Sequence, residues 1–449
     1  MSTIKPQNAK GTRDFGPQQM KRIDYIFETI AKNFEAYGFM KIATPAVEKL
    51  DVLTGKYGDE GDQLLFKILN NGDYLKKVKS EEVESKDLKS VTKKVSERGL
   101  RYDLTVPFAR FVSANQNDLA FPFKRYQIAS VWRADRPQKG RYREFFQCDA
   151  DIIGSKSIMD EVSLMEIFDK SFKDLGLKGL SIKVNNRKVL QALANQMNAG
   201  DRIVELTVAI DKLDKIGPEK VLEELSQKGF NKDQLNYLSP LFELGDKKFS
   251  NIDKYEKLKN IFSHEPLGMQ GIEELETLEK LCQATGIEII DFDPTLARGL
   301  DYYTGCIFEV KPDDGSMGSI GSGGRYDDLT NVFGLKDMSG VGISFGADRV
   351  YDLMLERGLF ENIDNSLDYM IINFSDDHRV NYLELANKLR DKGHTVEVYP
   401  SSAKMKKQMN YANKRLVKNV IFLGEDEIKK GMYTVKRMSD GAQTEHLNE

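Results

Sequence analysis

Hydrophobic residues recur at helical spacing near the start of the chain. Between residues 18 and 37 the apolar positions fall at steps of three or four and are followed by Gly38 as a stop. They are Ile23, Phe27, Ile30, Phe34 and Tyr37. Because this spacing places them on one face, we predict an amphipathic helix. The segment FMKIATPAV then reads as a strand, and Pro45 confines it to a sheet edge or an irregular position, where it could lie at a boundary or a subunit contact.

Two apolar runs, Tyr126 to Trp132 and Phe145 to Ile153, flank a polar turn at Pro137 to Gly140. This pattern predicts a β-hairpin with a charged loop. Between the first strand and this hairpin, residues 76–98 are mixed in sign and poor in apolar residues. We interpret them as a solvated insertion and assign them no function.

The remaining pattern divides the chain into domains. Residues 186–286 read as helices with Gly and Pro breaks and contain no chemical motif, so we expect a helical insertion between core segments 1–185 and 287–360. Residues 361–367 read as a linker. In 368–449, β and α patterns alternate, which predicts a small, mostly parallel α/β domain. The fold class is therefore α/β, with an α+β core.

Composition limits the function classes. A length of 449 residues allows about three domains. The N-terminus lacks an apolar signal region and no run approaches the roughly 18 apolar residues of a spanning helix, so we expect a cytoplasmic protein with no membrane partner. Cys148, Cys282 and Cys306 are too far apart for CxxC zinc spacing or a disulfide framework. The net charge of −4 leaves only local patches for binding RNA.

The hairpin carries the chemistry that stands out first. Its basic residues are Lys124, Arg125, Arg133, Arg136, Lys139, Arg141 and Arg143. Arginine forks bind phosphate in bidentate fashion. The carboxylates Asp135, Glu144, Asp149 and Asp151 stand among them, which favours a ligand with a phosphate and an amino group. All four histidines lie outside this segment, so we expect neither a histidine base nor a His-rich metal site.

Three later segments are candidates for ligand binding. GSIGSGGRYDD lacks the GxGxxG register, so its glycines allow close approach of either a ligand or a neighbouring strand. In LARGLDYYTGCIFEV, the adjacent Tyr302 and Tyr303 precede a strand, and alternation would turn one to the core and one to a ligand. Arg349 begins a helix, where it could bind phosphate or, as spacing alone favours, pair with Asp348.

Together these residues carry a resemblance. VWRADRPQKGRYREF resembles motif 2 of class II aminoacyl-tRNA synthetases, GVGISFGADRV resembles motif 3, and the helix and strand ending at Pro45 look like motif 1. KGTRDFGP, LRYDLTVPFAR, LARGLDYYTG and GSGGRYDDL are similar to the histidyl-tRNA synthetase family specifically. The resemblance runs from Lys10 into the C-terminal domain.

The resemblance implies a six-stranded antiparallel catalytic sheet with flanking helices, an anticodon-binding domain at 368–449 and a homodimer. It implies activation of L-histidine by ATP, bound with Mg²⁺, to histidyl-adenylate, and transfer to the 3′ end of histidine tRNA. No metal ligand in the protein is implied.

The same resemblance implies roles at matching positions. Arg133 and Arg298 are the expected catalytic arginines, with Arg133 on the α-phosphate. ATP would be bound by Arg133, Asp135, Phe145 and Arg349. Histidine would be bound by Asp103, Thr105, Gln147, Asp151, Tyr302 and Tyr303. The acceptor stem of the tRNA would meet Gln138, Lys139 and Arg141. A basic helix containing Lys404, Lys406, Lys407, Lys414, Arg415 and Lys418 suits phosphates, although a solvated face explains it as well.

One position departs from the class pattern: Asp135 stands where glutamate is usual, which puts its adenine contact in doubt. Two alternatives also remain. A non-catalytic paralogue, such as the regulatory subunit of ATP phosphoribosyltransferase, would typically lack the C-terminal domain and the motif arginines, which this chain has. A pure RNA-binding module would not need the Asp and Tyr set.

Overall fold

The structure is a computed structural model, and it describes residues 4–55, 58–138, 140–245, 248–297, 302–361, 363 and 366–448. The chain forms two compact units. The first comprises Met1–Asp14 and Ile23–Phe360, and the second comprises Phe15–Arg22 and Glu361–Glu449.

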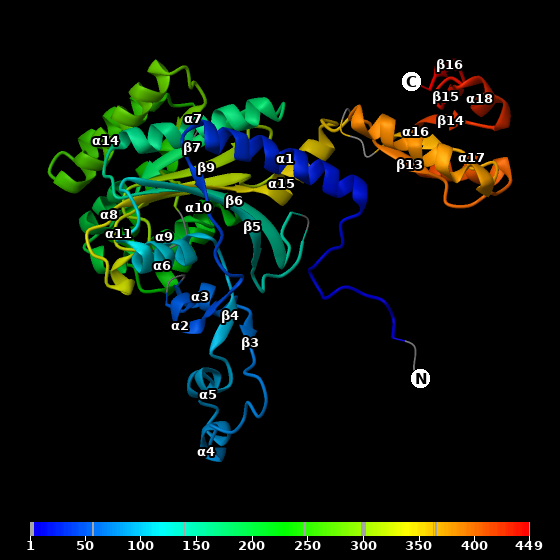
Figure 1. Cartoon of the computed structure of the whole chain (residues 1–449). Coiled ribbons are helices and arrows are strands. Elements are labelled where there is room, and N and C mark those ends of the chain that lie inside the picture. The colour runs from blue at the N-terminus through cyan, green and yellow to red at the C-terminus, as the bar shows by residue number, and fades with distance from the viewer. Residues whose placement is uncertain are drawn as a thin grey trace. The chain divides into compact units, whose positions relative to one another are not determined.

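An eight-stranded sheet organises the first unit (Figure 1). Its strands, in spatial order, are β1 (Met40–Lys41), β5 (Phe123–Trp132), β6 (Glu144–Ile153), β11 (Gly340–Gly346), β10 (Gly321–Tyr326), β9 (Cys306–Pro312), β7 (Leu180–Asn186) and β8 (Ile290–Phe292). The hairpin predicted from the two apolar runs is confirmed as β5 and β6, which pair antiparallel from Phe123 opposite Ile153 to Trp132 opposite Glu144.

The expectation of six strands needs a correction. The six inner strands from β5 to β7 pair antiparallel, but β1 adds to one edge and β8 to the other, each in parallel. These edge strands contain only two and three residues, and the number six came from the family resemblance, which does not count them. The segment before Pro45 does lie at an edge, as that proline requires.

Aromatic packing fixes one face of this sheet. The amphipathic helix is confirmed as α1 (Pro17–Ala36). The Phe34 ring lies 5.4 Å from Tyr126 on β5 and 5.8 Å from Phe345 on β11. Helix α7 (Ile158–Asp174) adds Phe168, 4.8 Å from Phe345. Burying such rings supplies much of the stability of this layer.

The opposite face is polar. Side chains alternate along a strand, so Cys148, Ala150 and Ile152 face the helices while Gln147, Asp149 and Asp151 face the other way. Helix α6 (Thr105–Asn115) covers part of this second face, where Phe108 packs 6.3 Å from Phe123. The polar residues beside it remain available to a ligand.

Helices fill the segment between β7 and β8, as the sequence predicts. They are α8 (Arg187–Gln196), α9 (Ile203–Ile210), α10 (Leu213–Gln227), α11 (Lys232–Asn236), α12 (Leu238–Leu244), α13 (Asn251–Ile261) and α14 (Pro266–Ala284). A 3-10 turn, η1 (Gly200–Arg202), precedes α9. This helical segment belongs to the first compact unit.

A three-stranded sheet carries the charged segment. It contains β2 (Val47–Lys49), β4 (Arg98–Leu100) and β3 (Lys67–Ile68), next to α2 (Leu50–Leu53) and α3 (Gly58–Gln63). Residues 76–98 include α4 (Ser80–Glu84) and α5 (Leu88–Val95), joined by the ion pair of Lys94 with Glu82 at 2.6 Å. Most of this segment is exposed, so it is a solvated insertion with two short helices.

The second unit has its own sheet, in the order β13 (Val396–Val398), β12 (Leu367–Ile371), β14 (Val417–Phe422), β15 (Met432–Arg437), β16 (Gln443–Leu447). Its helices are α16 (Arg379–Asp391), α17 (Met405–Lys414) and α18 (Glu425–Lys430), with η3 (Asp376–His378) before α16. β12 begins at Leu367, the last residue of the expected linker, and residues 362, 364 and 365 lie outside the described part of the chain.

This second sheet is mixed rather than mostly parallel. β12 pairs in parallel with β13 and β14, whereas β14, β15 and β16 pair antiparallel. For β15 and β16 the reason is the short connection at Asp440 and Gly441, since a tight turn can join only antiparallel neighbours. The Asp-Gly pair is a turn signal that the α/β alternation concealed.

The chain has no helix, within its described ranges, that is long and apolar enough to cross a membrane. Cys148, Cys282 and Cys306 are buried and free of disulfides, as their spacing suggested.

Candidate functional site

A cavity of about 930 Å³ opens on the polar face of the large sheet. Its walls come from the β5–β6 hairpin, β9, β10, β11, the residues before α6 and the start of helix α15 (Ala347–Glu356). Of the expected site residues that the structure describes, all line it: Asp103, Thr105, Arg133, Asp135, Gln138, Arg141, Phe145, Gln147, Asp151, Tyr302, Tyr303 and Arg349.

Acidic and amide side chains form one wall. Gln147, Asp149 and Asp151 stand at period two on β6 and are 8%, 2% and 2% exposed. The Oε1 atom of Gln147 and the Oδ1 atom of Asp149 are buried without a hydrogen-bond partner. Leaving acceptors unsatisfied is costly, so this wall is suited to a ligand that supplies N–H donors.

Asp151 is held from two sides. Its Oδ2 atom pairs with the buried guanidinium of Arg125, and its Oδ1 atom accepts a 2.8 Å hydrogen bond from the hydroxyl of Tyr326. Burial raises the pKa of Asp151, while Arg125 and Tyr326 lower it. A Cβ at Gly342 would lie 2.0 Å from Oδ1 of Asp151, so glycine is required opposite this carboxylate.

Asp149 is the most perturbed carboxylate of the wall. Burial raises its pKa to about 7, Arg125 and a hydrogen bond from Ser344 lower it, and Asp151 and Asp103 raise it. Ser344 also accepts a 2.8 Å hydrogen bond from Nε2 of Gln147. The carboxylate therefore changes charge near neutral pH inside the cavity.

Asp103 and Thr105 lie at the start of α6. The Asp103 carboxylate, 4% exposed, accepts a 3.0 Å hydrogen bond from the backbone of Val106 and so caps the helix. Thr105 is the first residue of the helix. The cap fixes Asp103 close enough to Asp149 and Asp151 to raise the pKa of both.

Arg133 stands between two aromatic rings at the other end of the cavity. Its guanidinium carbon lies 4.2 Å from the Tyr102 centroid and 5.2 Å from that of Phe145. Its Nε donates a 3.1 Å hydrogen bond to the carbonyl of Tyr102. These contacts hold a planar cation with an aromatic ring beside it, an arrangement that suits a phosphate joined to a base.

The hairpin loop is closed by internal contacts. Asp135, 8% exposed, pairs with Arg141 at 2.9 Å. Gln138 and Arg141 exchange backbone hydrogen bonds of 3.0 and 2.9 Å. Arg141 is exposed, and its guanidinium is therefore accessible at the mouth of the cavity.

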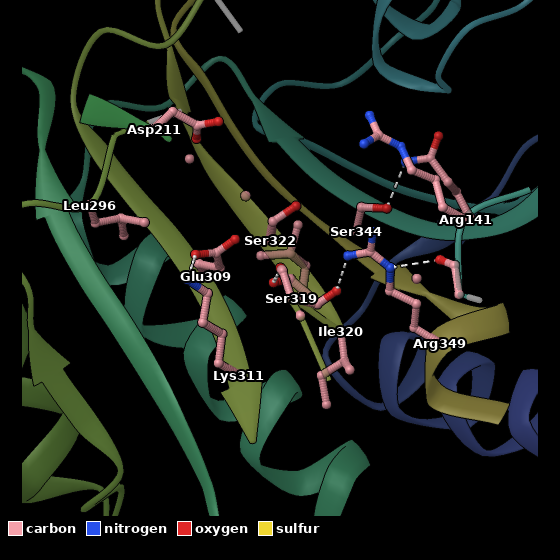
Figure 2. Close-up of a pocket in the computed structure, with 18 of the residues that line it drawn as sticks. Arg141, Asp211, Leu296, Glu309, Lys311, Ser319, Ile320, Ser322, Ser344 and Arg349 are labelled. Carbon is pink, nitrogen blue, oxygen red and sulfur yellow. Dashed lines mark hydrogen bonds and ion pairs between the residues drawn. The ribbon is translucent and has the colours of Figure 1, made fainter. Parts of the chain in front are cut away.

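Figure 2 shows Arg349 reaching from α15 towards the cavity, where it donates to the carbonyls of Gly140 and Ser319 at 2.9 and 2.6 Å. Asp348 turns to other partners: Arg13 and the backbone N–H of Phe146. On β9, Glu309 and Lys311 also line the cavity and form a 2.8 Å ion pair with each other (Figure 2).

The expected split between Tyr302 and Tyr303 is wrong. Both residues precede β9, so strand alternation does not apply, and both line the cavity with ring centroids 4.9 Å apart. Glycines beside them serve strand approach: a Cβ at Gly324 would lie 2.7 Å from Tyr303, and one at Gly323 would lie 2.2 Å from the carbonyl of Gly342.

Arg298, Asp301 and Lys139 lie outside the described residues. Their roles therefore stay predictions from the sequence.

The sequence pattern does not single out Tyr326 and Ser344, which line the cavity, and it does not show that Arg125 is fully buried next to the acidic wall. Asp149 stands in the sequence among the carboxylates that favour a ligand amino group, and period two places it on the same face of β6 as Gln147 and Asp151. In the sequence, Arg125 belongs to a cluster of basic residues. Its side chain is fully buried, which no charge count reveals.

The cavity therefore has two ends. At one end the carboxylates of Asp103, Asp149 and Asp151 lie around Arg125, and at the other end are Arg133 and Arg349, with the ring of Phe145 beside Arg133. A ligand that matches it has a cationic, N–H-rich part and an anionic part joined to a base. Within the described residues, no group of three or more His, Cys, Asp or Glu is placed to hold a metal ion.

Comparisons with known proteins agree with this geometry. A model described as "Histidyl-tRNA synthetase" matches residues 73–350, and one described as "Anticodon binding domain" matches residues 368–448. A histidine–tRNA ligase of Christiangramia forsetii is 49% identical over 98% of this chain and 97% of its own length. One from Phocaeicola vulgatus is 49% identical over 98% of this chain and 96% of its own length.

Among solved structures, the histidyl-tRNA synthetase of Nostoc sp. PCC 7120 superposes with a TM-score of 0.80 at 30% identity, covering 99% of this chain and 97% of that one. A structure from Bacillus halodurans, titled as an ATP phosphoribosyltransferase regulatory subunit/histidyl-tRNA synthetase, has a TM-score of 0.73 at 22% identity and covers 94% of this chain and 99% of that one. At that identity it supports the fold alone.

Proposed function

Because the chain belongs to the histidyl-tRNA synthetase family, we propose that it activates L-histidine with ATP and transfers the histidyl group to the 3′ end of histidine tRNA. The observation that carries this proposal is the pairing of unsatisfied acceptors on Gln147 and Asp149 with Arg133 and Arg349 in one cavity. Histidyl-adenylate has an ammonium group and an imidazole at one end and a phosphate and adenine at the other.

ATP binding is assigned to the arginine end of the cavity. Arg133 would bind the α-phosphate, and the ring of Phe145, 5.2 Å from its guanidinium, would stack on adenine. Arg349 would bind the other face of the base or the γ-phosphate. Asp135 is the remaining candidate for ATP binding. For Asp135 to contact adenine, its ion pair with Arg141 would have to break, or its carboxylate would have to bind both groups at once.

Histidine binding is assigned to the acidic wall. Asp103, Thr105, Gln147 and Asp151 would bind the α-ammonium group and the imidazole, while Tyr302 and Tyr303 would line the ring. The support is chemical: an ammonium group offers three donors and a neutral imidazole one, and the wall offers acceptors. Burial raises the pKa of Asp151, and the buried Arg125 opposes this by favouring the charged form, to which a cationic group of the ligand would add.

The chemistry runs in two steps. A carboxylate oxygen of histidine attacks the α-phosphorus, and the bond to pyrophosphate breaks. The 3′-terminal hydroxyl of the tRNA then attacks the carbonyl carbon, and AMP leaves. Arg133 and Arg298 would stabilise the charge that builds on the α-phosphate oxygens in the first step.

Mg²⁺ is proposed as a companion of ATP rather than a resident ion. The triphosphate itself supplies the oxygens that Mg²⁺ prefers, and this ion commonly binds proteins through few direct ligands. It would neutralise the departing pyrophosphate, while the arginines of the cavity bind the α-phosphate.

tRNA contacts are proposed at two places. Gln138, Lys139 and Arg141 would meet the acceptor stem at the mouth of the cavity. The second unit would bind the anticodon, with the exposed lysines of α17 as candidates. The functional domains would then be 1–185 and 287–360 for catalysis, 186–286 as an insertion and 368–449 for the anticodon.

We also propose a homodimer that works in the cytoplasm. Support for the dimer is the apolar exposure of Met40 on the edge strand β1 and of Val47 on β2, which are 55% and 42% exposed. Analytical ultracentrifugation tests it, and a monomer at micromolar concentration contradicts it. The cytoplasmic location is supported by the fact that ATP and tRNA are available in the cytoplasm.

The regulatory-subunit alternative is not supported. Relatives at 49% identity over almost the whole chain are histidine–tRNA ligases, and the chain retains Arg133, Arg298 and Arg349. An RNA-binding module does not account for the acidic wall.

The deciding experiment is exchange of radioactive pyrophosphate into ATP. Exchange should require L-histidine, and charging should require histidine tRNA. Equal stimulation by several amino acids contradicts the assignment, and so does an absence of exchange in folded protein.

A further inference from the structure

The N-terminal segment packs against the hairpin loop in the first unit. The carbonyl of Gly11 accepts a 2.8 Å hydrogen bond from the backbone N–H of Arg143. Gly11 has φ +86°, and a Cβ there would lie 2.9 Å from Cγ of Pro137 and 2.8 Å from Cγ of Arg143. This close approach, in a conformation that favours glycine, fixes the segment on the loop.

Arg13 joins this segment to two other elements. Its guanidinium lies 3.2 Å from the centroid of the Tyr142 ring, at the end of the hairpin loop. The same group forms an ion pair with Asp348, in the first turn of α15. A single side chain therefore contacts both the loop that follows Arg133 and the helix that carries Arg349.

Asp348 extends this contact to the strand. Its Oδ2 atom accepts a 2.7 Å hydrogen bond from the backbone N–H of Phe146, between Phe145 and Gln147 on β6. Asp348 is 7% exposed, and burial raises its pKa while the Phe146 N–H and Arg13 lower it. The carboxylate needs Arg13 as its counter-charge, since an unpaired buried charge is strongly unfavourable.

We propose that Arg13 is a positioning residue for ATP: through Asp348 and Tyr142 it holds the hairpin and the start of α15 in the arrangement that places Arg133, Phe145 and Arg349 around the nucleotide. This inference rests on the proposed function. Arg13 does not line the cavity formed by the described residues, so it acts through these neighbours rather than by contact with substrate.

Small displacements of the ATP-binding groups follow from the loss of Arg13. Loss of the guanidinium leaves Asp348 with the Phe146 N–H and a deficit of positive charge, so the carboxylate turns towards water and pulls on the strand and the helix start. Phe145 precedes the N–H that Asp348 accepts, and Arg349 follows Asp348 in the chain. A shift of about 1 Å in such groups can cost roughly a hundredfold in rate.

The chain offers a matched control. Arg110 forms an ion pair with Glu48 in the first unit, and the side-chain exposures are 29% and 6%, against 24% and 6% for Arg13 and Asp348. Neither Arg110 nor Glu48 lines the cavity. Arg13→Gln and Arg110→Gln therefore remove equivalent charges from equivalent depths.

The measurement is pyrophosphate exchange by the full chain with ATP and L-histidine varied separately, normalised by active-site titration. Arg13→Gln should lower kcat/KM for ATP roughly ten- to a hundredfold and change the KM for histidine less than threefold. Arg110→Gln should change neither by more than about twofold. Adding Asp348→Asn to Arg13→Gln should recover part of the loss, because a neutral amide needs no counter-charge.

Three outcomes overturn the inference. They are equal kinetics for the two glutamine variants, a loss in Arg13→Gln that active-site titration restores completely, and a loss that falls on histidine as strongly as on ATP. If Arg13→Gln does not fold, Arg13→Lys and Tyr142→Leu are read by the same criteria. Absence of exchange in the wild-type protein contradicts the proposed function instead, so the two failures are distinct.

Discussion

The hydroxyl of Tyr326 and the Oδ1 atom of Asp151 lie 2.8 Å apart, and the two residues are 1% and 2% exposed. The bond crosses from β10 to β6 over the intervening strand β11, where glycine at position 342 leaves room for it. With Arg125 on its other oxygen, Asp151 is fixed before any ligand arrives. A fixed carboxylate does not have to be ordered on binding, which favours affinity for a cationic group.

Removing this carboxylate should weaken histidine binding selectively. Asp151→Ala should raise the KM for histidine in pyrophosphate exchange by about tenfold or more, because the acceptor for a substrate N–H is lost and Arg125 is left unpaired. The KM for ATP should change much less. Tyr326→Phe should have a smaller effect of the same kind, since only one of the two restraints on Asp151 is removed.

Glu161→Gln is the control for loss of a buried acid. Glu161 is 1% exposed and pairs with Arg325 on the opposite face of the sheet. This variant should lower the melting temperature without raising the KM for histidine. An unchanged KM in Asp151→Ala would remove Asp151 from the pocket.

These residues illustrate what the sequence can predict. The alternation of side chains along β6 and the helical spacing of apolar residues in α1 could be predicted from the sequence, because both follow from the geometry of a single element. The contacts of Asp151 could not be predicted in this way, because Tyr326 and Asp151 are 175 positions apart in the sequence and only the strand order of the sheet brings them together. The family resemblance predicted many of the residues that line the cavity, but not the contacts that orient their side chains. The segment that contains β1 was expected to be a strand, but its parallel pairing with β5 depends on a partner that a local pattern does not contain.

A second prediction concerns pH. Asp149 has a pKa of about 7 in the folded chain, raised by burial above the value of an unfolded aspartate. Arg125 and Arg101 favour its charged form, and Asp151 and Asp103 oppose it. If ionised Asp149 attracts the substrate cation, kcat/KM for histidine should rise through about pH 7 more steeply in the wild type than in Asp149→Asn. Histidine itself titrates in this range, so the difference between the two proteins is the measured quantity.

The stability of the fold should change with pH in the opposite direction to kcat/KM. Between the unfolded pKa near 4 and the folded pKa of about 7, the folded chain holds a proton that the unfolded chain has lost, so stability falls as pH rises through this window. The Asp149→Asn variant has no titrating group at this position, so it does not lose stability in this way. Its melting temperature relative to the wild type should therefore increase from pH 5 to pH 8. A constant difference would mean that Asp149 does not titrate in this range.

Arg298 provides a prediction from the sequence alone. If it stabilises charge that develops only in the transition state, Arg298→Ala should lower kcat for exchange by roughly 10²- to 10³-fold, the range for loss of one such donor. KM should change less. Arg298→Lys, which retains the charge without the planar fork, should recover part of the rate. A defect confined to KM would make Arg298 a binding residue rather than a catalytic one.

The last prediction tests the second unit as an RNA-binding unit. Lys406 and Lys407 are exposed on α17, while Lys429 and Lys430 are exposed on α18 and serve as the control pair. Lys406→Glu/Lys407→Glu should leave histidine-dependent exchange intact, because activation occurs in the first unit, and should reduce charging by raising the KM for tRNA. Each lost contact to phosphate should also lower the slope of log affinity against log salt by about 0.7 to 0.9, because fewer counterions are released. The same reversal at Lys429 and Lys430 should have a smaller effect on both quantities. If the two double variants behave alike, α17 presents only a solvated face and the anticodon contact lies elsewhere in the unit.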